Sequence, residues 1–196
     1  MGFCTGRVVI DTGTGFGGLS PEAAEFLRNR PEVERLTPLR FNLVTLLTSK
    51  GAREEQAQRG TTENGSAVGE PEFMIGMDLD AAFKMVRFDG LTPRIATLAT
   101  GEIMVLESTA DENGWKVGDR IPVSFAQTGR PTLRIAATFA ARVGQGASII
   151  SNLDTLTANA TPEFRTDSTI WVQLRDGVSA ATALSAIKPE LKKIAP

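Results

Sequence analysis

The stretch Gly101–Phe125, GEIMVLESTADENGWKVGDRIPVSF, carries two strand patterns separated by a short helical one. Residues 102–106 and 120–125 are rich in Ile, Val, Leu and Phe, which favour extended structure. Residues 108–113 are expected to form a short helix capped by its first residue. Gly114 should end that helix, because glycine readily adopts the left-handed conformation at a helix C-terminus. This part of the chain is therefore predicted to be β-rich, with short helices between strands.

The same pattern extends on both sides of this stretch. A strand over 132–139 should follow a hairpin turn at Thr128-Gly129. The other elements expected here are a strand over 73–77, a helix over 79–86, a strand over 148–150 and a helix over 153–159.

The two ends of the chain carry a different pattern. A strand over 7–11 precedes a helix that begins with Ser20 as N-cap and Pro21 as first residue, and a strand over 33–47 with a bend at Pro38 follows. Near the C-terminus, a strand over 169–174 leads to a helix capped by Ser179, in which Pro189 should produce a kink. The ends thus read as β-α-β and β-α.

These patterns predict an α+β fold in two parts. Both chain ends, residues 3–47 and 165–196, should form a split βαβ/βα subdomain, and residues 72–164 an inserted β-rich subdomain with short helices. Residues 48–71 lack apolar periodicity and are expected to form a long polar loop. The chain begins almost directly with a strand, so we expect it to be an excised piece of a longer protein.

Composition excludes several functions. The 196 residues include no His and no Tyr, which removes mechanisms that need an imidazole base or ligand or a phenolic acid. Cys4 is the only cysteine, so an internal disulfide and a multi-thiolate zinc site are excluded. With a formal net charge of −2 and no basic cluster, nucleic acid is not an expected partner. No catalytic residue, cofactor-binding residue or metal ligand is assigned, and no cofactor is expected.

The segment VVIDTGTGFGGLS at 8–20 contains two short enzyme motifs. Gly13-x-Gly15-x-x-Gly18 after a strand is similar to a dinucleotide-binding turn. That turn requires its third glycine inside the helix, but the cap here is Ser20, so the helix begins too late. The stretch LRFNLVTLL also lacks the carboxylate that would bind a ribose.

The second motif is Asp11-Thr12-Gly13-Thr14, which is typical of an aspartic protease loop. With FMIGMD at 73–78 it resembles a retroviral-type protease, in which two copies of Asp11 would share one proton in a homodimer. A helix after Ser20 does not fit such an enzyme, and the protease is kept as the alternative. The simpler interpretation is a strand-to-helix loop in which glycines tolerate positive φ and need no packing.

A resemblance covers nearly the whole chain. Residues 101–125, with the turn Gly114-Trp115-Lys116-Val117-Gly118-Asp119, resemble the extracytoplasmic domain of MacB/FtsX-type ABC transporter permeases. SPEAAEFLRNRPEVERLTPLRF, FMIGMD, TLRIAATF and TIWVQLRDGVSAATALSAIKPELKKI are similar, in that order, to further segments of this family. Of the 21 basic residues 15 are Arg, and we expect a high-GC source such as the actinobacteria.

The resemblance implies a non-catalytic domain on the extracytoplasmic face of the bacterial plasma membrane, soluble when excised. Its partners would be the permease's own transmembrane helices, a cytoplasmic ATP-binding subunit and an envelope protein or lipid substrate. The domain would couple ATP hydrolysis to export or to mechanical work on envelope partners. Trp115 and Trp171 are candidates for a contact patch, but their strand context favours core positions. The loop 48–71 is longer than the family pattern requires.

Overall fold

The computed structural model describes residues 6–11, 18–46, 70–86, 90–126, 128–140, 146–160 and 165–194. Its elements, in chain order, are β1 (Arg7–Asp11), α1 (Pro21–Arg28), β2 (Val33–Leu46), β3 (Glu70–Met77), α3 (Leu79–Met85), β4 (Leu91–Thr92), β5 (Glu102–Leu106), α4 (Glu107–Asn113), β6 (Arg120–Phe125), β7 (Thr132–Phe139), β8 (Ile149–Asn152), α5 (Leu153–Ala158), β9 (Thr169–Leu174) and α6 (Ala180–Ile194).

The chain forms two compact units. The terminal unit comprises Met1–Arg40, Met77–Arg87 and Glu163–Pro196, and the inserted unit comprises Phe41–Gly76 and Phe88–Pro162. The subdomain boundaries expected from the sequence stay a prediction. This division groups α3 with the chain ends and the second half of β2 with the insertion.

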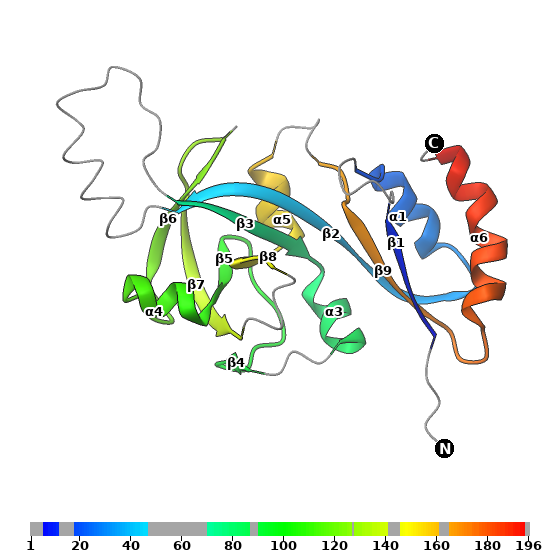
Figure 1. Cartoon of the computed structure of the whole chain (residues 1–196), viewed down its shortest axis with the longest axis horizontal. Helices are drawn as coiled ribbons and strands as arrows, with labels where there is room; N and C mark the ends of the chain where they lie inside the picture. The colour runs from blue at the N-terminus through cyan, green and yellow to red at the C-terminus, as the bar shows by residue number, and fades with distance from the viewer. Residues whose placement is uncertain are drawn as a thin grey trace. The chain divides into compact units, whose positions relative to one another are not determined.

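The terminal unit is built on a sheet of β1, β9 and β2. β9 lies between the other two and pairs antiparallel with each, so β1 and β2 run parallel to one another. The β1-α1-β2 segment is therefore a βαβ unit split by a strand that arrives from the far end of the chain. Helices α1 and α6 contact each other and lie side by side in Figure 1.

One face of this sheet packs against α1 and α6. Alternate β9 residues, Ile170, Val172 and Leu174, are buried in one cluster with Leu27 of α1 and Ile187 of α6. Because successive strand residues point to opposite faces, this alternation identifies the helix-covered face and leaves the other face, here called the outer face.

Local signals explain where the two helices begin. Ser20 caps α1 by accepting a hydrogen bond from the Glu22 N–H at 3.3 Å, and Pro21 occupies the first turn, where its missing N–H costs nothing. Ser179 accepts one from the Thr182 N–H at 3.1 Å at the start of α6. Both predicted caps are confirmed. Helix α6 continues through Pro189.

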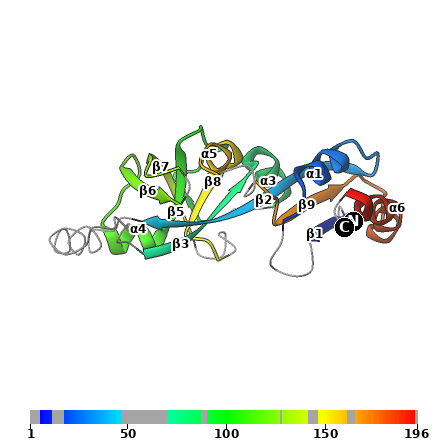
Figure 2. The ribbon, with the colours of Figure 1, turned by 90° about the horizontal axis from the view of Figure 1, so that it is seen from above.

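The inserted unit contains a closed ring of strands. β2, β3, β8, β5 and β7 are successive hydrogen-bonded neighbours, and β6 closes the ring because it pairs with both β7 and β2. β5 and β7 run parallel, while β8 is antiparallel to β5. Each of these six strands therefore has strand partners on both sides within the described residues, which limits the open edge that invites unwanted strand pairing. Figure 2 shows α5 beside β8, which it contacts.

Inward-facing residues of all six ring strands share one core. Its members are Val44, Leu46, Met74, Ile103, Val105, Ala110, Ile121, Val123, Phe125, Leu133, Ile135, Ile149 and Leu156. The residues of each strand in this cluster have one parity, as expected when one face of a strand is buried. Trp115 packs against the same cluster, so its predicted core position is confirmed.

The structure corrects some predicted details. Helix α4 begins at Glu107, and its N-cap position is Leu106, which makes no side-chain cap, so the predicted Ser108 cap is wrong. Gly114 does end the helix, at φ 68°. Glu70 and Pro71, predicted to belong to the polar loop, open β3. The rest of that loop and the glycine-rich part of 12–17 lie outside the described residues.

Candidate interaction surface

The outer face of the terminal unit carries a row of polar side chains where β2 meets β9. The pairing of these strands shifts by one residue between Val33 and Arg35, which is a β-bulge. Val33 and Leu36 both face the helices, so the bulge directs Glu34 and Arg35 to the outer face together.

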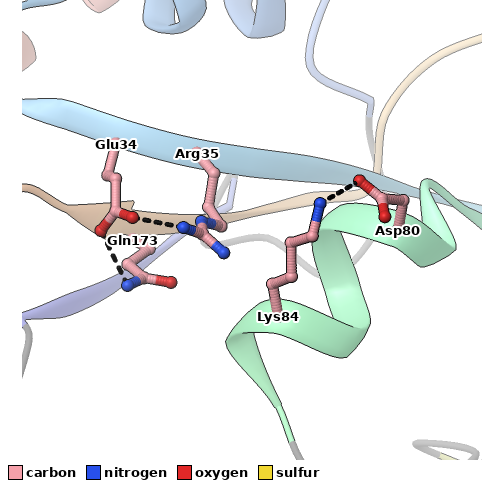
Figure 3. Close-up of polar contacts among 5 residues, drawn as sticks. All are labelled: Glu34, Arg35, Asp80, Lys84 and Gln173. Atoms are coloured by element: carbon pink, nitrogen blue, oxygen red, sulfur yellow. Dashed lines mark hydrogen bonds and ion pairs between the residues drawn. The ribbon is translucent and has the colours of Figure 1, made fainter.

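These two side chains form an ion pair that a neighbour extends. Arg35 Nη2 contacts Glu34 Oε1, and Gln173 Nε2 of β9 donates to Glu34 Oε2 at 2.9 Å (Figure 3). Gln173 is largely buried, and no hydrogen-bond partner of its Oε1 atom is found among the described residues. The outer face therefore holds an ordered polar group anchored on two strands.

Helix α3 is anchored on the outer face of the terminal unit. Its cap residue Asp78 accepts a hydrogen bond from the Ala81 N–H at 3.1 Å, and the Asp78 N–H donates to Thr37 Oγ1 at 2.9 Å. Asp80 and Lys84 form a 2.6 Å ion pair one helical turn apart on α3 (Figure 3). Both of these side chains are more than half exposed, so this pair contributes little to stability.

The outer face also has an apolar part. Val9 of β1 lies opposite Trp171 of β9, which in turn lies opposite Thr37 of β2. Val9 is 59% exposed, and Trp171 is only partly buried. Trp171 has the opposite parity to the helix-side core residues of β9, so the predicted core position for it is wrong. Alternation along 169–174 would have placed it on the face opposite Ile170 and Val172.

Asp11, the residue of the protease alternative, is the last residue of β1. It is exposed on the outer face and pairs in register with Thr169. Of the loop that would complete an aspartic protease site, residues 12–17 are outside the described residues.

The glycines of the opening loop were expected to be there for backbone freedom and not for packing. For Gly18 this expectation is wrong. A Cβ atom at this position would lie 1.9 Å from the Cβ atom of Thr166, so the two chain segments approach too closely for any side chain. The adjacent residues Leu19 and Asp167 exchange backbone hydrogen bonds of 2.7 and 2.9 Å. Gly18 is therefore required by close approach rather than by backbone conformation.

A buried ion pair lies next to this contact. Arg40 Nε donates to Oδ1 of Asp167 at 2.6 Å, and the Asp167 side chain is fully buried. Within the part of the chain that the structure describes, Oδ2 of the same carboxyl has no hydrogen-bond partner. Burial raises the pKa of Asp167 above its ordinary value, and the Arg40 guanidinium opposes that shift only in part. A buried, ion-paired carboxyl of this kind holds structure rather than reaching a substrate.

The inserted unit exposes three large apolar side chains that the sequence patterns did not single out. Phe41 and Leu43 of β2 and Phe73 of β3 point away from the buried cluster and are each at least 40% exposed. The sequence did carry a signal for these exposed residues. Residues 43–44 and 73–75 are all apolar, and consecutive apolar residues indicate a strand that is apolar on both faces.

Within the described residues, no group of three or more acidic, histidine or cysteine side chains is placed to hold a metal ion. In the same part of the chain, no helix has the length and apolar character needed to cross a membrane.

Solved structures share this fold. The periplasmic region of MacB from Actinobacillus actinomycetemcomitans has a TM-score of 0.63 at 15% identity, over 95% of this chain and 82% of that one. A permease-protein domain from Porphyromonas gingivalis has a TM-score of 0.56 at 18% identity, over 96% and 82%. The extracellular domain of the noncanonic ABC-type transporter YknZ from Gram-positive bacteria has a TM-score of 0.57 at 10% identity, over 91% and 82%. The predicted α+β class is confirmed.

The α+β fold, with a split βαβ unit and a closed ring of strands, is thus that of extracytoplasmic domains of ABC-type permeases. The model of the MacB-like periplasmic core domain matches residues 5–190, and the chain belongs to this family. No curated protein matches it in sequence. The predicted relationship to MacB/FtsX-type permeases and the extracytoplasmic location are confirmed. The actinobacterial source stays a prediction.

Proposed function

We propose that this domain transmits work between a cytoplasmic ATPase and the cell envelope, as part of an ABC permease. The observation that carries the proposal is the family match over residues 5–190. Its direct partners would be the permease's transmembrane helices, and the ATP-binding subunit would act through them. An envelope protein or a lipid would be the substrate or partner on the outside.

The internal connections of the chain support a mechanical role. The boundary between the compact units falls inside β2, after Arg40, and again near the end of β3, before Met77. The chain therefore passes between units within regular strands at these two points, and not through Gly/Ser-rich linkers of the flexible kind. Each unit also has its own buried cluster, so each can keep its structure under load.

We propose further that the domain is not an enzyme. The absence of His and Tyr from the sequence removes the commonest general base and the phenolic acid. Asp11 is exposed at the end of a strand, whereas Asp167 is buried against Arg40. Peptidase activity at acid pH should be absent from both the wild-type chain and the Asp11→Asn variant. Activity that disappears in Asp11→Asn would instead support the protease alternative, which the comparisons do not support.

The coupling proposal is tested in the complete permease with its ATPase. Replacing residues 6–194 by a short Gly/Ser linker should leave ATP hydrolysis measurable but abolish transport or the envelope phenotype. The Lys193→Ala variant is the matched control, because it changes only an exposed ion pair within α6 and should retain both activities. Full transport by the linker variant would refute the coupling role. The gene should also encode apolar spans of about 20 residues flanking this domain.

A further inference from the structure

Strand β1 is an edge of the terminal sheet in the described part of the chain. It pairs with β9 on one side, and no second strand partner of β1 is found among the described residues. Exposed and half-buried side chains alternate along β1, with Arg7, Val9 and Asp11 exposed. An edge of this kind is a template for another strand.

The hydrogen-bond register shows which backbone groups face this edge. The Leu174 N–H donates to the Gly6 carbonyl at 2.9 Å, so Gly6 and Leu174 form a hydrogen-bonded pair. Such pairs alternate along an antiparallel ladder, and Val8 and Ile10 therefore also direct their backbone groups to β9. The backbone N–H and C=O groups of Arg7, Val9 and Asp11 consequently point away from β9, toward the edge.

The sequence of β1, Arg7-Val8-Val9-Ile10-Asp11, complements itself when it is reversed. If a second β1 is placed antiparallel with Val9 opposite Val9, then Arg7 lies opposite Asp11 of the other copy, and Asp11 lies opposite its Arg7. All three positions have outward-facing backbone groups, so each would form a hydrogen-bonded pair. Opposite charges directly across an antiparallel pair are stabilising, and like charges are destabilising.

The apolar residues favour the same arrangement. Val8 and Ile10 pack against the helix-side cluster but remain only partly buried. In the antiparallel pairing Val8 lies opposite Ile10 of the second copy, so the two helix-side clusters would become continuous. Val9, which is 59% exposed, would be covered by its own counterpart on the outer face.

We propose that β1 is a self-association strand, by which two copies of this domain join antiparallel about a two-fold axis at Val9. The result is a continuous sheet in the order β2-β9-β1-β1-β9-β2. A parallel arrangement is disfavoured, because it would place Arg7 beside Arg7 and Asp11 beside Asp11. The charge pattern selects a second copy over an unrelated strand. This inference rests on β1 alone and does not depend on the transport role.

Charge exchange tests the register. Arg7→Asp places two carboxylates opposite each other at both ends of the interface, and Asp11→Arg places two guanidinium groups there. Each single variant should raise the dimer Kd roughly tenfold or more, because two pairs change from attraction to repulsion. The double variant Arg7→Asp/Asp11→Arg restores opposite charges and should return the Kd to near the wild-type value. Sedimentation over a concentration series measures these constants.

Two controls separate this register from a general charge effect. Arg175→Asp changes the net charge as Arg7→Asp does, but at an exposed position beyond the end of β9, and it should leave the Kd unchanged. High salt should reduce the difference between the single variants and the wild type, because exposed charges are screened. Single variants that associate like the wild type, or a double variant that is no better than the single ones, would overturn the proposal.

Crosslinking tests the two-fold axis independently of charge. In a Cys4→Ser background, Val9→Cys places two thiols opposite each other in a hydrogen-bonded pair, where a Cα separation of about 5.5 Å allows a disulfide. Oxidation should give a covalent dimer at least about tenfold faster than for Val117→Cys, a control at an exposed apolar site of the inserted unit. Equal rates, or faster crosslinking through Val117→Cys, would show that β1 does not face β1. Circular dichroism checks that each variant is folded.

Discussion

The contact between Gly76 and Leu156 should control the stability of the inserted unit. Gly76 lies near the end of β3, and Leu156 of α5 covers it within the buried cluster. A Cβ atom on residue 76 would lie 2.5 Å from Leu156 Cδ1 and 3.0 Å from its Cγ. The whole isobutyl group would have to move, and it is only 2% exposed. Gly76→Ala should therefore destabilise the unit by about 1–3 kcal/mol through overpacking.

This sign is opposite to that of an ordinary Gly→Ala change. Where the backbone tolerates it, such a change stabilises a protein by about 0.4–1 kcal/mol, because the unfolded chain loses conformational freedom. Leu156→Ala alone should cost about 2–5 kcal/mol through lost burial and a cavity. In the double variant the new methyl group occupies part of that cavity. The combined cost should then be smaller than the sum of the single costs by about 1–3 kcal/mol.

The two tryptophans allow the inserted unit to be followed separately. In a Trp171→Phe background, fluorescence reports on Trp115, which packs against the cluster that contains Leu156. Urea denaturation then gives the free energy of unfolding for the single and double variants. Leu184→Ala, at a site on α6 that is 40% exposed, is the control and should not change this signal. A stabilising Gly76→Ala, or costs that add within about 0.5 kcal/mol, would refute the packing argument.

Three further predictions concern caps, a turn and a buried charge. Ser20→Ala should lower the stability of the terminal unit by about 0.5–1 kcal/mol, because one N–H of α1 loses its acceptor. Denaturation followed by the fluorescence of Trp171, in a Trp115→Phe background, measures this loss. An unchanged denaturation midpoint would show that the Ser20 cap does not stabilise the unit. Gly114→Ala should lower the free energy of unfolding by about 1 kcal/mol, because residue 114 has a left-handed φ of 68°. Asparagine tolerates that conformation better than alanine, so Gly114→Asn should show a smaller loss in the same denaturation experiment. Burial raises the pKa of Asp167 above its ordinary value of 3.8. Between these two pKa values the folded chain retains a proton that the unfolded chain has released. The contribution of Asp167 to stability should therefore increase as the pH falls from the raised pKa toward 3.8. Asp167→Asn should remove that part of the pH dependence, and identical stability profiles against pH for variant and wild type would contradict it.

Local patterns were sufficient where a residue's role depends on its neighbours in the chain. The Ser20 and Ser179 caps lie within a few residues of the groups that they bind. The hairpin between β6 and β7 follows from two apolar runs and Thr128-Gly129, and Gly129 has a φ of 89°. The end of α4 at Gly114 follows the same logic. Ser108 shows where local patterns fail. Serine can cap a helix only if the helix begins directly after it, and α4 begins at Glu107, immediately after β5 ends at Leu106.

Strand order could not be derived from local patterns. β9 lies between β1 and β2, although more than 120 residues separate it from β2 in the chain. β5 and β7 pair parallel, and β6 closes the ring onto β2, and no short motif specifies either contact. These pairings join strands that are not consecutive in the sequence, and neither composition nor periodicity carries information about them.

The opening segment shows why short glycine motifs mislead. Gly13, Gly15 and Gly18 satisfy the spacing of a nucleotide-binding turn, but spacing does not state which physical property of glycine is used. At Gly18 that property is the absence of a Cβ atom, because Thr166, at the entry to β9, occupies the space. At Gly114 it is the left-handed backbone, and no atom of the described residues lies within 4 Å of the position of a Cβ. The first requirement depends on a residue far along the chain, so only the fold reveals it. In the same way Asp11, the first residue of an apparent catalytic motif, is the last residue of β1, where it forms the acidic end of a strand edge whose basic end is Arg7.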